Sequence, residues 1–96
     1  MYVLVSYDVA TRTKEGRRRL RRVARACEAK GQRVQYSLFE CKLDPAEWVA
    51  FRNELLSIID RESDSLRVYK LGRRLHERLE HHGAKPGYDV TGPLLV

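Results

Sequence analysis

The chain has 96 residues, a length typical of one domain with a modest core, and we predict a single domain over residues 1–96. Hydrophobic residues make up 43% and charged residues 33%, a composition that excludes a disordered chain. No apolar run approaches the ~18 residues of a membrane span, so no membrane partner is expected. The net charge of +6 favours an anionic partner.

The first predicted element is a strand over residues 2–9, which are rich in Val, Leu and Tyr and indicate a central strand buried on both faces. These residues lack the basic segment and the cleavage site of a signal peptide, so we expect the protein in the cytoplasm. Asp8 closes the apolar run and is interpreted either as a turn or capping residue or as a ligand of Mg²⁺. One carboxylate is too few for this ion, and a dimer that brought two copies of Asp8 together would supply more ligands.

A polar loop over 10–15 leads into a predicted amphipathic helix from about Glu15 to Lys30, with Gly31 as its C-cap. Between residues 12 and 25 lie eight basic residues and one acid, a charge of +7, so the rest of the chain sums to −1. Solvated helices usually interleave Glu with Lys at four-residue spacing, so this pattern favours phosphate binding over a merely solvated surface. Arginine also suits bidentate contacts to phosphate. The candidate nucleic-acid-binding residues are Arg12, Lys14, Arg17, Arg18, Arg19, Arg21 and Arg22.

The middle of the chain predicts two strands and a second helix. Residues 32–43 are rich in β-branched and aromatic side chains and are divided near Tyr36–Ser37 into two strands. In "DPAE", Asp44 is the expected N-cap and Glu47 the third helical residue of a capping box. The apolar stripe that follows extends the predicted helix to about Arg61.

The loop "DRESDS" at 60–65 is expected to be solvated, and "LRVYKL" at 66–71 predicts a fourth strand. The order βαββαβ predicts an α+β, ferredoxin-like fold, with an antiparallel four-stranded sheet and both helices on one face. Residues 72–96 or a second copy of the chain would then cover the other face. The pattern just after residue 72 is locally helical, and the apolar end "LLV" indicates a tail that docks.

Other candidate reactive side chains carry weaker signals. Cys27 and Cys41 lack metal-ligand spacing and are interpreted as reduced, buried thiols. The adjacent His81 and His82 are disfavoured as joint ligands of one ion, because neighbouring residues on a strand point to opposite faces.

"YVLVSYDV", an Arg-rich helix start and "RVQYSLFEC" together resemble the CRISPR-associated protein 2 family over essentially the whole chain, and the ending "EHHGAKPGYDVTGPLLV" resembles its I-C subtype. Members are small, dimeric, ferredoxin-like proteins that act in spacer acquisition beside the CRISPR integrase. The resemblance therefore implies a homodimer, an integrase partner and double-stranded DNA as substrate, with RNA as the alternative. It also implies that residues near 78–82 form a fifth strand exchanged with the partner's sheet, in place of the local helix, so that residues 72–96 contribute to the dimer.

The resemblance also implies a set of catalytic residues. Asp8 would be the ligand of Mg²⁺, with Mn²⁺ as an alternative ion. At the helix start, Arg17 and Arg19 are the two arginines assigned to the catalytic set. Because three arginines are consecutive there, it stays open whether Arg18 takes the place of one of them. The residues implied are Tyr7, Asp8, Arg17, Arg19, Arg33 and Phe39.

Two functions of different classes follow from this resemblance. The predicted function is a metal-dependent endonuclease in which the ion activates water and arginines position the phosphate backbone. The alternative is an architectural subunit whose dimer bridges integrase subunits and holds duplex DNA without cutting it. An RNA-binding ferredoxin-like module is disfavoured, because "SLFECKL" lacks the glycine and the aromatic pair of that motif.

Overall fold

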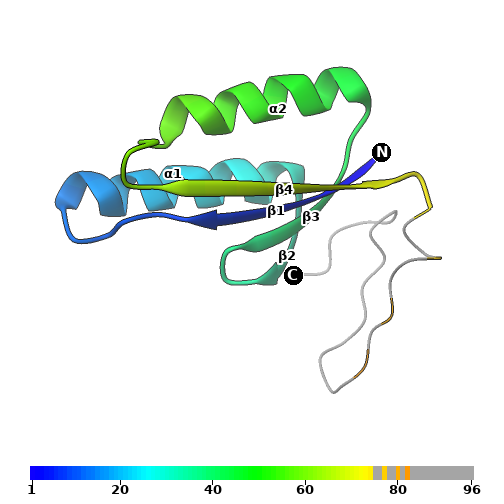
Figure 1. Ribbon diagram of the computed structural model, residues 1–96, viewed down its shortest axis with the longest axis horizontal. Helices are drawn as coiled ribbons and strands as arrows, with labels where there is room; N and C mark the ends of the chain where they lie inside the picture. The colour runs from blue at the N-terminus through cyan, green and yellow to red at the C-terminus, as the bar shows by residue number, and fades with distance from the viewer. Residues whose placement is uncertain (75–76, 78–79, 81, 83–96) are drawn as a thin grey trace.

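The computed structural model describes residues 1–74, 77, 80 and 82 (Figure 1). The strands form one antiparallel sheet in the order β2-β3-β1-β4. This βαββαβ arrangement confirms the predicted α+β, ferredoxin-like fold, including the turn at Tyr36 and Ser37. The elements in chain order are β1 (Tyr2–Asp8), α1 (Lys14–Lys30), β2 (Gly31–Gln35), β3 (Leu38–Lys42), α2 (Pro45–Ile58) and β4 (Ser65–Gly72).

β1 is the central strand, paired with β3 on one side and β4 on the other. Alternate residues of β1 and β3 share one core with α1 and α2, so both helices lie on the same face of the sheet. Leu4 and Ser6 point to the opposite face and are only half-buried. The prediction that β1 is buried on both faces therefore holds fully only for the helix side. The most enclosed core residues are Val3, Val5, Val23, Cys27, Phe39, Cys41, Phe51 and Leu55.

The ends of α1 lie close to their predicted positions, but Gly31 differs from a usual C-cap. At the N-terminus, the side-chain oxygen of Thr13 accepts the N–H of Gly16 at 3.0 Å. At the C-terminus, the N–H of Gly31 donates to the Cys27 carbonyl, yet its backbone is extended and already begins β2. Glycine is needed here for space, because a Cβ would collide with the carbonyl oxygen of Glu40 on β3.

The capping box predicted for α2 is confirmed. Asp44 Oδ1 accepts the N–H of Glu47 at 2.7 Å, and Glu47 Oε1 accepts the N–H of Asp44 at 3.0 Å. α2 ends at Ile58, short of the predicted end near Arg61.

The loop between α2 and β4 is not wholly solvated, which corrects the prediction for "DRESDS". The Asp64 side chain is buried and folds the loop back on itself. Its Oδ2 accepts the N–H of Asp60 at 2.9 Å, and its own N–H donates to the Asp60 carbonyl at 2.7 Å. These bonds turn the chain just after α2, which explains the early end of the helix.

The predicted helix after residue 72, the exchanged strand near 78–82 and the docked "LLV" end fall largely on residues that lie outside those described. Among the residues that are described, no helix has both the length and the apolar character needed to cross a membrane.

Candidate nucleic-acid interface

Asp8 is exposed and is the last residue of β1, which runs beside β4 in the sheet (Figure 1). It pairs across the strands with Ser65 at the start of β4. The neighbouring Tyr7 donates its N–H to the carbonyl of Ser37 at 3.1 Å, which holds the β2–β3 turn at the same end. Within the described ranges, Asp8 has no ion-pair partner. No charged group of the described residues therefore competes with an external ligand for this carboxylate.

Asp8 provides the kind of oxygen that Mg²⁺ prefers, but a single carboxylate is too few ligands for this ion. In the part of the chain that the structure describes, no group of three or more His, Cys, Asp or Glu side chains comes together. The other oxygens of an octahedral site would come from water, a phosphate or a second chain. The donor chemistry therefore fits the ion as a partial site.

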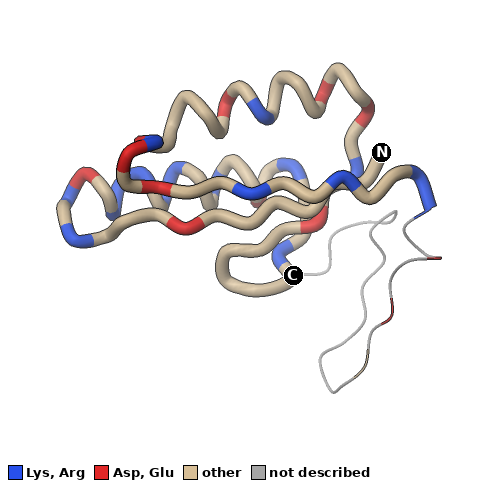
Figure 2. The backbone as a smooth tube through the Cα atoms, viewed as in Figure 1, with Lys and Arg blue, Asp and Glu red and all other residues tan. Residues whose placement is uncertain are grey.

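The basic side chains around the start of α1 are exposed, with one exception. Figure 2 shows Lys and Arg in the loop before α1 and along the helix. Arg17 is fixed at its position by a hydrogen bond from Nη1 to the Thr11 carbonyl, at 3.2 Å. The exposed members are named the basic surface below: Arg12, Lys14, Arg17, Arg18, Arg21, Arg22 and Arg25.

Arg19 is the exception, because it forms an ion pair with Asp64. Its Nε lies 2.8 Å from Asp64 Oδ2, and its Nη2 lies 3.4 Å from both Asp64 Oδ1 and the hydroxyl of Ser63. The Arg19 side chain is 19% exposed and the Asp64 side chain is 0% exposed. Of the three consecutive arginines, Arg17 and Arg18 are thus exposed, whereas Arg19 points toward Asp64 in the loop between α2 and β4.

Asp64 was not identified by the sequence analysis. The loop that contains it has three acids in six residues, and nothing in that pattern marks one of them as buried. Burial would raise the pKa of Asp64, but hydrogen bonds from Arg19 and from the N–H groups of Asp60 and Ala10 outweigh this effect, so the pKa lies below its usual value. Two of its partners, Ala10 and Arg19, are 54 and 45 residues away in the sequence, and only the fold brings them to Asp64.

The structure brings together Tyr7, Arg33 and Phe39, three residues that the resemblance singled out. The Arg33 guanidinium lies over the Phe39 ring, 4.9 Å from its centroid, and the Tyr7 and Phe39 rings are 6.1 Å apart. Two hydrogen bonds converge on the Tyr36 carbonyl, from Arg33 Nη1 at 2.6 Å and from the Tyr7 hydroxyl at 3.2 Å. A 2.6 Å ion pair with Glu28 on α1 completes the environment of Arg33.

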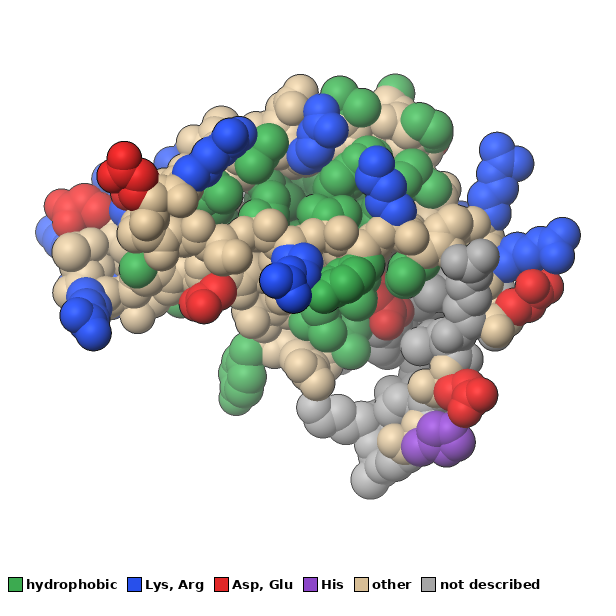
Figure 3. Space-filling view, in the orientation of Figure 1, with side chains coloured by type: hydrophobic (Ala, Val, Ile, Leu, Met, Phe, Trp, Pro, Cys, Tyr) green, Lys and Arg blue, Asp and Glu red, His purple; other side chains and the backbone are tan. Residues whose placement is uncertain are grey.

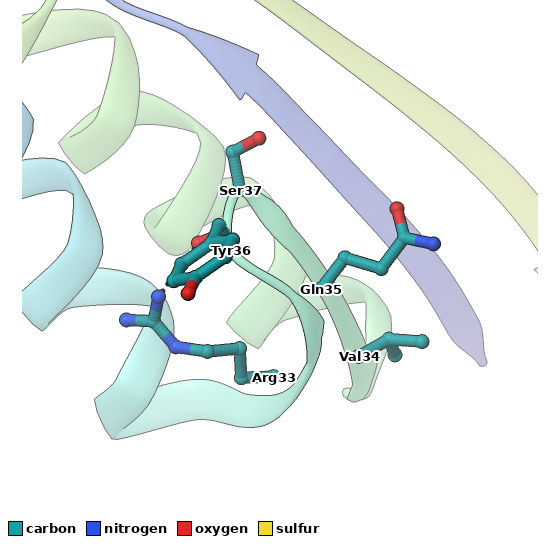
Figure 4. A pocket seen from close by; sticks show the side chains of 5 residues that line it. All are labelled: Arg33, Val34, Gln35, Tyr36 and Ser37. Atoms are coloured by element: carbon teal, nitrogen blue, oxygen red, sulfur yellow. Dashed lines mark hydrogen bonds between the residues drawn. The ribbon is translucent and has the colours of Figure 1, made fainter. Parts of the chain in front are cut away.

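These three residues differ in what they can reach. Phe39 is 0% exposed and Tyr7 is also buried, so both contact only protein atoms. Burial raises the pKa of the Tyr7 phenol. Arg33 is exposed and lines a shallow hollow with Tyr36, whose own side chain is 91% exposed. Figure 4 shows the Arg33 guanidinium reaching toward Tyr36, with Val34 and Gln35 on the other side of the strand end.

The fold and the site together define a small ferredoxin-like α+β protein with an exposed carboxylate beside a basic helix. The model of the family described as CRISPR associated protein Cas2 matches residues 1–78, and the chain belongs to this family.

Curated relatives agree with this assignment. The CRISPR-associated endoribonuclease Cas2 of Nitratidesulfovibrio vulgaris is 54% identical over 96 residues, which cover 100% of this chain and 94% of that protein. The CRISPR-associated endonuclease Cas2 of Halalkalibacterium halodurans is 50% identical over 95 residues, 99% of each chain. Among solved structures, Streptococcus pyogenes Cas2 at pH 6.5 superposes with a TM-score of 0.75 at 52% identity, covering 86% of this chain and 100% of that one.

Proposed function

We propose that this protein is a metal-dependent endonuclease that cleaves phosphodiester bonds of nucleic acid in CRISPR spacer acquisition. The relatives' names, endoribonuclease and endonuclease, support a nuclease. The observation that carries the chemistry is the position of Asp8: an exposed carboxylate at the end of a central strand, joined by a short loop to the basic surface. Double-stranded DNA is the proposed substrate, following the I-C resemblance of the C-terminal sequence, and RNA is the competing one.

The chain's own residues would divide the work. Asp8 would hold Mg²⁺, or Mn²⁺ in its place, and its pairing with Ser65 of β4 holds its backbone at the end of β1. The bound ion would supply the charge that activates water and stabilises the phosphate. Arg17 and Arg18 would hold the phosphate backbone through bidentate contacts and offset negative charge that develops there. Arg33, held by Glu28 and the Tyr36 carbonyl, would present a further guanidinium at the same end of the sheet.

A homodimer would complete the metal site. Since a single carboxylate is too few ligands for the ion, two copies of Asp8 around one ion would give it a pair of charged ligands, and the ion would relieve the repulsion between them. The CRISPR integrase is the proposed protein partner.

An architectural role is the second candidate. It is favoured by the contrast between the metal ligands and the basic surface: among the described residues no cluster of three potential metal ligands forms, whereas the basic surface has seven exposed basic side chains. In that role the dimer would hold duplex DNA between integrase subunits, and cleavage would not be needed.

Asp8→Asn separates the two candidates. The substitution keeps the size of the side chain and removes one charge from each subunit, so folding and DNA binding should persist. Mg²⁺-dependent cleavage of duplex DNA should fall by orders of magnitude. Glu62→Gln is the matched control, because Glu62 is an exposed acid in the loop before β4, and this variant should cleave normally.

Three outcomes are informative. Cleavage that persists in Asp8→Asn would refute the metal assignment. Lost cleavage with normal spacer acquisition, measured with the integrase in cells, would support the architectural role. Failure of acquisition by a mutant that still dimerises and binds both DNA and the integrase would refute the purely architectural role.

A further inference from the structure

We propose that Arg19 and Asp64 form a positioning pair that fixes the loop after Asp8, and that Arg19 is not a phosphate ligand. This inference rests on the proposed function, because it assigns a role within the same nucleic-acid site. It changes the expected role of Arg19, which the family resemblance placed among the catalytic arginines.

The Asp64 carboxylate is a junction between three segments. Oδ1 accepts the N–H of Ala10 at 3.0 Å, in the loop that follows β1. Oδ2 accepts Arg19 Nε of α1 at 2.8 Å and the N–H of Asp60 at 2.9 Å, at the end of α2. One fully buried carboxylate therefore ties the β1–α1 loop, the first turns of α1 and the α2–β4 loop together.

This junction flanks Asp8 on two sides. Ala10 follows Asp8 by two residues, and Asp64 precedes Ser65, which is the cross-strand partner of Asp8. The Ala10 carbonyl is also confined, because α1 approaches it so closely at Gly16 that a Cβ there would collide with it. With its N–H bonded to Asp64 and its carbonyl against Gly16, Ala10 has little freedom, and the backbone leaving Asp8 is fixed.

Little of the Arg19 guanidinium is available to bind a phosphate. Two of its three guanidinium nitrogens are engaged with Asp64 and Ser63, and most of the side chain is enclosed. Moving it to a phosphate would leave the buried carboxylate of Asp64 unpaired, which is strongly unfavourable. Arg18, its exposed neighbour, would meet no such penalty.

The first experiment measures binding of a labelled DNA duplex over a range of NaCl concentrations. Each phosphate contact contributes about 0.9 to the slope of log K against log[salt]. The test variant is the neutral pair Arg19→Gln/Asp64→Asn, which avoids an unpaired buried charge, and Arg18→Gln is the matched control. We expect the Arg18 variant to flatten the slope by about one contact and the neutral pair to leave it unchanged.

The second experiment measures the cleavage rate at saturating DNA for Arg19→Gln, for Asp64→Asn and for the neutral pair that combines them. A displaced catalytic loop can cost about 10- to 100-fold in rate, and we expect such a loss with less than about a twofold change in the Kd for DNA. The effects of the two single substitutions should not add, since both remove the same pair. Ile58→Val, a core substitution at the end of α2, controls for lowered stability and should cleave at the normal rate.

The outcomes separate this inference from the function on which it rests. A slope flattened by the neutral pair as much as by Arg18→Gln would overturn it and return Arg19 to the phosphate ligands. A full cleavage rate in the neutral pair would overturn the positioning role. If the unsubstituted protein cleaves nothing, the endonuclease proposal fails and the slopes alone decide the role of Arg19; if it binds no nucleic acid, both proposals fail.

Discussion

Burial separates the residues that can meet a substrate from those that act through packing. Phe39 and Tyr7 belong to the core, whereas Arg33 extends over the Phe39 ring with its guanidinium at the surface. The aromatic pair therefore serves as the platform for the arginine. Asp8 and Arg33 are the members of the implied catalytic set, apart from the helix arginines, that a phosphate could contact directly.

The two cysteines provide a test of the core at the residue scale. Burial raises the pKa of Cys27 and of Cys41 to about 12, with smaller contributions from Cys41 and Glu40 as neighbouring acidic groups. A cysteine in the unfolded chain has a pKa of about 8.5. Below that pH both thiols are protonated in the folded and the unfolded state, and their contribution to the free energy of unfolding is fully present. This contribution is lost as the pH rises toward 12, because the unfolded chain releases the protons first. We expect both thiols of the folded protein to resist a thiol reagent at about pH 8 and to react once urea unfolds it.

The pH dependence supplies the control for this prediction. A Cys27→Ala/Cys41→Ala variant should lose less of its free energy of unfolding between about pH 8 and pH 10 than the unsubstituted protein. Rapid labelling of both thiols in the folded protein would show that they are not enclosed as described.

At the scale of elements, α1 and β2 are joined without a loop. α1 ends at Lys30 and β2 begins at Gly31, whose Cα lies against the Glu40 carbonyl and the Cys41 Sγ of β3. The close approach allows the helix to pass directly into the edge strand, and it depends on the missing side chain.

Gly31→Ala should therefore destabilise the protein. The added methyl has no free space, and overpacking of this kind costs about 1–3 kcal/mol, which a urea titration followed by circular dichroism would measure. Ala29→Ser, an exposed substitution near the same helix end, should change the free energy of unfolding by no more than about 0.5 kcal/mol. Equal stability of the two variants would mean that β3 moves aside without cost.

Signals between near neighbours were sufficient to predict the elements. The capping box of Asp44 and Glu47 lies within four residues, apolar periodicity located both helices, and composition rich in β-branched and aromatic residues located the strands. Asp64 could not be predicted, because its partners Ala10 and Arg19 are 54 and 45 residues away and carry no local signal for the contact. The grouping of Arg33 with Phe39 and Tyr7 came from the family resemblance, and its physical basis became visible only in the packing.

On the scale of the whole molecule, the sheet has one face covered by helices, and β4 is the edge strand opposite β2, with apolar groups beside it. Figure 3 shows hydrophobic side chains gathered on both sides of β4 among separate Lys and Arg side chains. Tyr69 of β4 is an exposed aromatic there, and within the described residues β4 pairs with β1 alone. This edge is where the strand exchange implied by the family resemblance would occur.

Deletion of residues 78–96 tests that expectation. If a second copy supplies a strand to β4, the shortened protein should sediment as a monomer or aggregate through the uncovered edge. Ile58→Val, a core substitution away from the C-terminal segment, is the control for lowered stability and should leave the dimer intact. A stable dimer after the longer deletion, measured by sedimentation velocity, would exclude the exchange.

The loop-free junction between Lys30 and Gly31 also limits how the length of this chain can change during evolution or engineering. Side chains alternate between the two faces of a strand, so one inserted residue would turn Arg33 away from Phe39 and Glu28 and direct Gln32 into the core. A two-residue insertion would restore the faces but would shift β2 along β3 by one repeat. Homologous chains should therefore differ in length at the exposed Tyr36 turn and not at this junction.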